Sequence, residues 1–422
     1  MPALALSRVG TRVVESVGSV DSGTEEAGQG LVAEAWARLE QVRDPRSAQG
    51  RVYSLSCLLA IAVCAFTAAG HDGFTAVGQW IAKATPADLA RLGAPYDPLS
   101  RTYRAPDEKT VRSVLDRINP RELTRALLGP RRRVRTAPDG SPSRSVRAYR
   151  ARRAKRKLLL SARSRLRAVA VDGKSSRGAR RADGTRVHLL GVCEHGGRFL
   201  DQVEVDVKHN EVSHFQDLLD PLDLSGVVVT FDALHTVRAN LEWLVSTKKA
   251  HYIAVVKKNQ PLLRQRLKTL PWKQIPTGDR SAETGHSRIE TRTVKAAHVE
   301  GLDLPHACQA IKVTRWRQNA KTKKISRESL YVVTSLTSAK ATPADLARLL
   351  REHWSIEVHH HIRDLSFDED HRTNRTGHGP INLATIREAI INTIHDAGYL
   401  YLPEGRRDHI SPSDALYLHD LT

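Results

Sequence analysis

The spacing of apolar residues divides this chain into two parts of different character. Between about residues 31 and 128, apolar side chains recur every three or four positions in short segments separated by Gly, Pro and Asp, which predicts an all-α N-terminal domain. From about residue 166 they run together or alternate, as in LRAVAVDG, RVHLLGVCEH and GVVVTFDA, which is typical of strands. The order β-β-β-α-β-α-β predicts an α/β domain over residues 166–400, with a mixed sheet that starts as an antiparallel meander and is flanked by helices.

The remaining stretches depart from this pattern. Residues from about 275 to 338 read as further strands with polar turns, and we interpret them as a β-rich insertion into the α/β domain. Residues 1–30 are rich in Gly, Ser and Glu and are expected to be disordered, and residues 401–422 are expected to form a C-terminal tail. Nothing singles out a DNA-recognition helix in the N-terminal domain, so DNA binding and simple packing both stay open as its role.

A membrane location is not expected. The most apolar stretch, Leu55–Gly70, is shorter than the roughly 20 residues that span a bilayer and is rich in Ala and Cys, which favours a buried helix. The first residues lack the apolar core of a secretory signal. Four scattered cysteines without a CxxC pair argue against a zinc ribbon or a disulfide scaffold and favour the reducing cytoplasm.

Positive charge dominates the composition and is concentrated in one segment. Lys and Arg total 66 against 46 acidic residues, a net charge of +20, which favours a polyanionic partner such as nucleic acid. Residues 131–167 contain 15 Lys or Arg and one acid. We therefore expect residues 129–165 to form a basic linker or an arm that follows DNA.

Three carboxylates stand at positions where chemistry is expected. Asp172 and Asp232 each follow an apolar strand, and Glu357 lies on a later helix. Reactive groups gather where the strands of an open sheet end, so we expect the three to converge. Carboxylate oxygens suit hard divalent cations, and two such ions about 4 Å apart can clamp the attacking and leaving oxygens of a phosphodiester.

One long helix is expected to carry the glutamate. The string KATPADLARL occurs twice, at Lys83–Leu92 and Lys340–Leu349, and its Thr-Pro-x-Asp start is a strong helix N-terminus. We expect the second copy to begin a helix that presents one face of polar residues and an apolar stripe toward the core; the polar face comprises His353, Glu357, His361 and Asp364, and the stripe comprises Trp354, Val358 and Leu365. The run His359–His361 suggests zinc, but no HExxH pattern occurs, so DNA contact or support of the acids is the preferred role of these histidines.

Several residues are candidates for DNA contact. Lys174 and Arg177 fall in DGKSSRG, which we interpret as a turn after Asp172, and Lys257 and Lys258 follow another strand. Trp316 lies between two arginines and could stack on an unpaired base or belong to a β core. The histidines His353 and His361 complete this set.

At these residues the chain resembles a known family. AVDGKSSRG, KHNEV, VVTFDALHT, YIAVVKKNQ and REHWSIEVHHHIRDLSFDED are similar, in this order, to blocks of the DDE transposases of bacterial insertion sequences, closest to the H-repeat-associated (ISAs-type) branch. The segments DPRSAQGRVYSLSCLLAIAVCAF and GFTAVGQWIA resemble the helical domain that precedes the catalytic core in that branch. The resemblance covers residues 43–400.

The resemblance implies a ribonuclease H-like catalytic domain with two Mg²⁺ or Mn²⁺ ions and a double-stranded DNA partner, on which the protein acts as a homodimer. Carried over by position, the three metal-binding acids are Asp172, Asp232 and Glu357. His353 and Asp364 stand where the broader superfamily often has Arg and Lys. The expected activity is cleavage at the ends of an insertion sequence followed by strand transfer. A metal-dependent nuclease without strand transfer, and an inactive DNA-binding remnant, are the alternatives.

Overall fold

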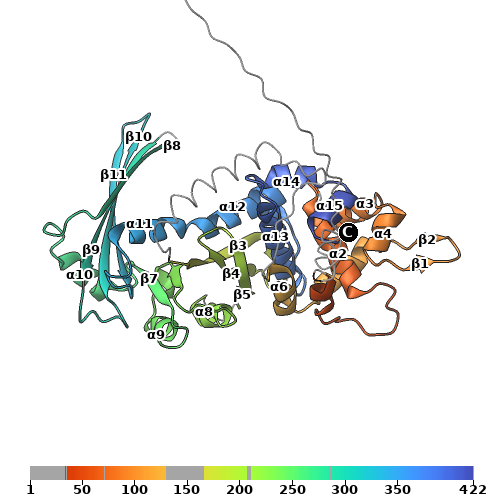
Figure 1. The fold of residues 1–422 in the computed structure, drawn as a ribbon, viewed down its shortest axis with the longest axis horizontal. Coiled ribbons are helices and arrows are strands. Elements are labelled where there is room, and N and C mark those ends of the chain that lie inside the picture. Colours follow the sequence, from red (N-terminus) through yellow and green to blue (C-terminus); the bar gives the residue numbers. More distant parts are fainter. Residues whose placement is uncertain are drawn as a thin grey trace, which may run out of the picture.

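The computed structural model describes residues 34–129 (apart from 35 and 71), 166–206, 211–285 and 288–421. The molecule is elongated, with a large sheet running from its centre to one end and a cluster of helices at the other (Figure 1). The predictions for residues 1–30 and for nearly all of the basic arm lie outside the described residues.

Five strands form the inner part of the sheet, in the spatial order β5-β4-β3-β6-β7. The first three along the chain are an antiparallel meander, and β6 and β7 run parallel to β3. This confirms the predicted β-β-β-α-β-α-β order; the elements are β3 (Ala168–Arg180), β4 (Arg186–Glu194), β5 (Phe199–Glu204), α8 (Glu211–Leu219), β6 (Val228–Phe231), α9 (Arg238–Ser246) and β7 (His251–Val256).

The expected β-rich insertion is the outer part of the same sheet. After α10 (Pro261–Thr269) the chain forms β8 (Asp279–Gly285), β9 (Arg288–His298), β10 (Gln309–Asn319) and β11 (Ile325–Thr334). Strand β11 pairs antiparallel with β7, so that Val333 lies opposite Ala254, and β10, β9 and β8 follow outward. The sheet therefore has nine strands and one continuous pair of faces.

Side-chain alternation assigns the helices to these faces. Val229 and Phe231 of β6 belong to the core under α8, α9 and α10, whereas Val228 belongs to the core under α11 (Pro343–Glu352). The second of these faces also receives α12 (Ser355–Phe367), and the two helices lie along it in Figure 1. Even-numbered positions of β3 and β6 consequently point toward α11 and α12.

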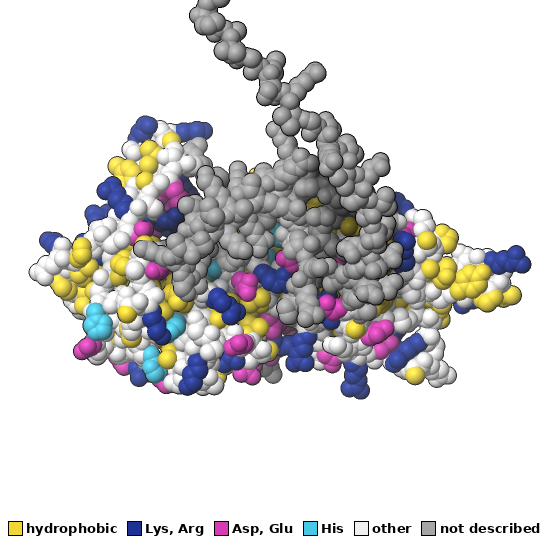
Figure 2. Space-filling view, in the orientation of Figure 1, with side chains coloured by type: hydrophobic (Ala, Val, Ile, Leu, Met, Phe, Trp, Pro, Cys, Tyr) yellow, Lys and Arg dark blue, Asp and Glu magenta, His cyan; other side chains and the backbone are white. Residues whose placement is uncertain are grey.

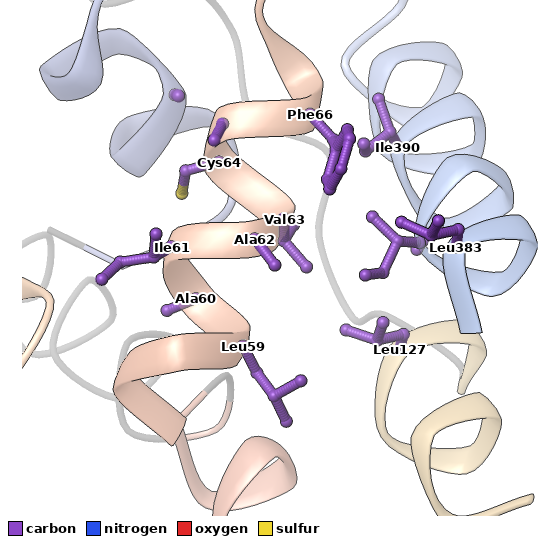
Figure 3. Close-up of a cluster of buried hydrophobic side chains, with 14 of the residues drawn as sticks. Leu59, Ala60, Ile61, Ala62, Val63, Cys64, Phe66, Leu127, Leu383 and Ile390 are labelled. Atoms are coloured by element: carbon purple, nitrogen blue, oxygen red, sulfur yellow. The ribbon is translucent and has the colours of Figure 1, made fainter. Parts of the chain in front are cut away.

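The helical end is built from both ends of the chain. It comprises α2 (Leu55–Thr67), α3 (Phe74–Ile81), α4 (Pro86–Arg91), the hairpin β1 (Tyr96–Asp97) and β2 (Thr102–Tyr103), α5 (Glu108–Leu115), α6 (Pro120–Leu128), α13 (Gly379–Asp396), α14 (Leu402–Asp408) and α15 (Pro412–Leu418). Figure 3 shows α2 facing Leu383 and Ile390 of α13, with Leu127 of α6 below them. The N-terminal helices thus share one core with the C-terminal ones, and the expected tail contains two helices.

Helix α2 confirms the expectation for Leu55–Gly70. Every residue of α2 is buried within the protein, and the Ser54 hydroxyl caps its start. No helix in the described ranges is long and apolar enough to cross a membrane. Such a completely buried helix has no polar face, because α13 and the neighbouring helices surround it.

The prediction of one long helix after Thr342 was wrong in two respects. It is two helices, with α11 ending at Glu352 and α12 beginning at Ser355, although both copies of KATPADLARL do form the expected capping box. The predicted apolar stripe is exposed, by 39% at Trp354, 54% at Val358 and 73% at Leu365. The buried face of α12 instead comprises Ile356, His359, Arg363 and Phe367. The polar members of that face can be buried because they are hydrogen-bonded to Glu369 and Glu388.

Candidate active site

The two aspartates leave neighbouring parallel strands at the same level. The ladder between β3 and β6 ends with Val171 opposite Phe231, and the next residues are Asp172 and Asp232. The prediction that Asp172 ends its strand was wrong, because β3 continues to Arg180. DGKSSRG is likewise no turn, since Gly173 remains paired with Leu190 of β4. Asp172 marks the end of the parallel pairing, whereas Asp232 does follow its strand and caps the short 3₁₀ helix η1 (Ala233–His235).

Glu357 reaches the same place from the first turn of α12. The junction before this helix is anchored to β6, because the Nδ1 atom of His353 lies 2.9 Å from the Thr230 hydroxyl. Seven residues beyond the glutamate, both oxygens of Asp364 accept hydrogen bonds from Lys174 of β3, at 2.7 and 2.8 Å. The helix is thus fixed to both strands that carry the aspartates.

All three carboxylates line one cavity of about 310 Å³. His353, Trp354 and Lys257 line it near the acids. Its opposite wall comes from the outer strands and α11. We call it the arginine wall, because it includes Arg292, Arg315 and Arg351. The cavity therefore brings acidic groups and guanidinium groups together on the α11/α12 face of the sheet.

Asp172 is perturbed by its burial and by neighbouring carboxylates. Burial, followed by the charges of Glu211, Glu357 and Asp232, raises the pKa of Asp172 to about 6 against the lowering effect of a backbone hydrogen bond at Gly173. Asp232 accepts a 2.6 Å hydrogen bond from the Leu234 amide and lies 3.6 Å from the Lys257 ammonium. A pKa raised partly by other carboxylates signals a local excess of negative charge, which a cation would relieve.

The donor chemistry fits hard divalent cations. The acids offer only carboxylate oxygens, the ligands that Mg²⁺ and Mn²⁺ prefer. As the side chains stand, no group of three or more His, Cys, Asp or Glu in the described ranges is gathered closely enough to hold a metal. In this arrangement the Asp232 carboxylate is engaged by the Leu234 amide and lies near the Lys257 ammonium.

The histidine run does not form a zinc site in this structure. His359 is buried between Glu388 and the Gly197 carbonyl, each at 2.7 Å. The Nδ1 atom of His360 lies 3.7 Å from Asp172, and burial lowers its pKa to about 3. His361 is exposed. The three rings thus occupy different environments.

The other candidates separate into buried and exposed residues. Lys174 is 8% exposed and paired with Asp364. The expectation that it contacts phosphate was therefore wrong, because its ammonium group binds a carboxylate inside the protein. His353 is partly buried, and the loss of hydration lowers its pKa to about 4. Arg177 is 76% exposed and pairs with Asp370 at 3.4 Å. The side chains of Lys257 and Lys258 are both exposed, and of these two Lys257 lines the cavity.

Of the two tryptophans considered from the sequence, Trp354 lines the cavity and Trp316 does not. Trp316 alternates with Arg315 and Arg317 on β10, so it points to the other face of the sheet and does not line the cavity. Trp354 does line it, and the guanidinium carbons of Arg292 and Arg315 each lie 5.2 Å from its ring centroid.

An arginine cluster on β9 and β10 was missed. Arg292 and Arg315 are directly opposite in the ladder, and both approach Glu290, a 6% exposed carboxylate, at 2.5 and 3.4 Å. Arg317 and Arg288 also approach it, so four positive charges surround one negative charge. Figure 2 shows Lys and Arg side chains along the end of the molecule formed by β8–β11. A signal was present in the sequence, because Arg288 and Arg292 fall on one face of the strand RIETRTVK, and Arg315 and Arg317 fall on one face of KVTRWRQ.

Comparison with protein families assigns the chain. Residues 163–391 match the transposase DDE domain, and residues 36–129 match the DDE_Tnp_1-associated domain. The chain belongs to the DDE transposase family. Its members act on DNA and generally use divalent metal ions.

Individual relatives agree with this assignment. The chain is 26% identical over 250 residues to a protein of Escherichia coli O157:H7 named "Putative transposase YncI", covering 54% of this chain and 62% of that protein. It is 26% identical over 241 residues to the "H repeat-associated putative transposase YhhI" of Escherichia coli K12, covering 54% of this chain and 63% of that protein. An uncharacterized protein of Xanthobacter autotrophicus is 28% identical over 262 residues, 60% of this chain and 77% of its own length. The match thus spans somewhat less than two thirds of the two named transposases.

Proposed function

We propose that this protein is a DNA transposase that cleaves DNA at the ends of an insertion sequence and joins the ends to target DNA. The observation that carries the proposal is that acids from β3, β6 and α12 line one cavity with an arginine wall, in a chain of the DDE family. The strand order β5-β4-β3-β6-β7, with its antiparallel meander and two parallel strands, supports a ribonuclease H-like core. Cytoplasmic location and action as a dimer on DNA belong to the same proposal.

Asp172, Asp232 and Glu357 would hold two Mg²⁺ or Mn²⁺ ions. When bound, such ions stabilise the charge that develops on the phosphodiester and activate the attacking oxygen. The chain's own contribution is to hold the three acids on rigid elements and to provide cations beside them. Lys257, which lies next to Asp232 and lines the cavity, is placed to contact a phosphate oxygen.

The arginine wall supports a DNA substrate. Burial, together with the charges of Arg317 and Arg292, lowers the pKa of Arg315, so an anion between these guanidinium groups would be stabilising. Phosphates are such anions, and arginine binds them with paired hydrogen bonds. A DNA strand that passes this wall would place its scissile phosphate at the acids.

The test is strand transfer by the purified chain. Inverted repeats that flank the gene supply the end sequences, which are made as duplexes with free 3′-hydroxyls and incubated with plasmid and Mg²⁺. Joined products are expected. Hydrolysis without joining would favour a metal-dependent nuclease, and DNA binding without either reaction would favour an inactive remnant.

The dimer is tested separately, by the mass of the protein with and without end DNA. Two chains per pair of ends are expected, because joining both ends of an element requires that they be held together. A single chain bound to each end under conditions that support joining would contradict the dimer.

A further inference from the structure

A fourth carboxylate lies behind the acids, on the opposite face of the sheet. Glu211 is the first residue of α8, and its Oε1 lies 2.7 Å from Nε2 of His188 on β4. Its Oε2 lies 3.0 Å from Nε2 of His235, the last residue of η1. One carboxylate therefore joins the inner meander to the turn that follows β6.

On one side this bridge reaches the strand of Asp172. The Nδ1 atom of His188 lies 2.7 Å from the Ser175 hydroxyl of β3. Gly173 directly follows Asp172 on this strand, and a Cβ added there would lie 2.4 Å from Glu211 Oε1. The carboxylate thus packs directly against the backbone that follows Asp172, and a glycine is needed there for it to approach.

On the other side the bridge reaches the turn of Asp232. Asp232 caps the start of η1, because its carboxylate accepts a hydrogen bond from the Leu234 amide. His235 is the last residue of η1. The His235 ring is 1% exposed and stacks on Phe215 with 5.0 Å between centroids. Its Nδ1 has no hydrogen-bond partner within the described part of the chain, so the ring is held through Nε2, which donates to Glu211.

The bridge lies where the backbone ladder stops. Hydrogen bonds between β3 and β6 fix their register as far as Val171 and Phe231, one residue before each aspartate. Burial raises the pKa of Glu211, but the hydrogen bonds from His188 and His235 outweigh it and lower the pKa to about 2. Glu211, which is hydrogen-bonded through both carboxylate oxygens, can therefore hold β3 and η1 together beyond the point where the ladder bonds stop.

We propose that Glu211 is a positioning residue that fixes the separation of Asp172 and Asp232, so that both carboxylates address the same divalent ion. The inference rests on the proposed function, since it assigns a role toward the ion that the two acids would share. Glu211 itself is on the other face of the sheet and acts through β3 and η1.

The test uses Glu211→Gln in the full chain, with Glu242→Gln as the matched control. Glu242 is also a helix carboxylate beside a histidine, His306 at 3.1 Å, but it is exposed on α9. Mn²⁺ binding is measured by calorimetry, and amide hydrogen exchange is followed in the segments around Asp172 and Asp232, under conditions where each variant is fully folded. Removing a group that supports a metal site typically weakens affinity by about 10- to 100-fold.

We expect Glu211→Gln to weaken Mn²⁺ binding by about tenfold or more and to speed exchange in both segments, with Glu242→Gln unchanged. Glu211→Asp, which keeps the charge but is too short to reach both histidines, should fall between them and serves if the Gln variant does not fold. A folded Gln or Asp variant with wild-type Mn²⁺ affinity and exchange would overturn the inference. Wild-type protein that binds Mn²⁺ but neither cleaves nor joins DNA would overturn the proposed function alone.

Discussion

Lys174 and Asp364 join the strand of one acid to the helix of another. The Lys174 ammonium is 2.7 Å from Asp364 Oδ1. Lys174 stands two residues after Asp172, and Asp364 stands seven residues after Glu357. The lysine side chain is 8% exposed and the aspartate 31%. A partly buried pair of this kind is valuable for placement, since each partner loses hydration that the other helps to replace.

Lys174→Met should lower the free energy of unfolding by about 1–3 kcal/mol, because it leaves Asp364 partly buried without its partner. Urea denaturation measures the change. Arg177→Ala is the control: it removes a neighbouring cation from an exposed pair and should cost less than about 1 kcal/mol. Equal destabilisation by the two variants would show that the buried pair contributes no more to the free energy of unfolding than an exposed pair.

Asp172→Asn should stabilise the protein at neutral pH. The folded-state pKa of about 6 lies above the ordinary value of 3.8, so keeping Asp172 ionised lowers the stability of the folded protein. This cost is complete above pH 6 and is absent below about pH 4. The gain should be about 1–2 kcal/mol above pH 6, discounted for partial exposure, and should vanish toward pH 4. Denaturation across pH 4–8 measures it, with the exposed turn variant Asp183→Asn showing no such gain. A pH-independent gain would contradict this explanation.

Arg363→Met should be among the most destabilising changes in α12. It removes the 2.7 Å bond to Glu369 and a 3.4 Å bond to Glu388, both carboxylates being almost fully buried, at an expected cost of about 3–5 kcal/mol. Arg363 also helps to hold the pKa of Glu369 well below its usual range, so wild-type stability should fall as pH drops below about 4.5.

The control for Arg363 is Arg348→Met on α11, which breaks a 2.9 Å pair four residues apart and should cost below about 1 kcal/mol. Equilibrium unfolding in urea compares the two. If Arg363→Met cost no more than the control, the buried charges would not be what holds α12 in place.

The arginine wall should carry part of the DNA affinity. Replacing Arg292 and Arg315 with Ala should weaken binding and reduce the slope of log affinity against log salt by roughly 0.9 for each phosphate that the wild-type arginines neutralise. Fluorescence anisotropy over a range of salt measures this. Arg238→Ala on α9, an exposed arginine on the opposite face of the sheet, should leave the slope unchanged. A double variant with the wild-type slope would show that DNA does not cross this wall.

Much of the fold followed from local patterns. Alternation and apolar runs predicted the inner strands and their order, and the Thr-Pro-x-Asp starts predicted α4 and α11. The three acids were chosen from local features, as aspartates after apolar runs and a glutamate on a later helix, although Asp172 does not end its strand. The chain order predicted which strands come first but not that β11 would join β7 and extend the sheet to nine strands.

The errors concern long-range pairing. The burial of Lys174 depends on Asp364, 190 positions away, and the polar buried face of α12 depends on Glu388 of α13. A stripe prediction assumes that apolar residues face inward, which fails when charged residues find buried partners. The break at His353 and Trp354 has the same origin, since Thr230 holds His353 at the sheet.

The most direct test of the central claim is single-turnover cleavage of end DNA by Asp172→Asn, Asp232→Asn and Glu357→Gln. Each isosteric change removes one carboxylate charge from the shared cavity, and each should slow cleavage on the order of 10³-fold, with DNA affinity within a few-fold of wild type. A variant that cleaves at the wild-type rate while the wild type is active would contradict the claim that these three acids form one catalytic centre.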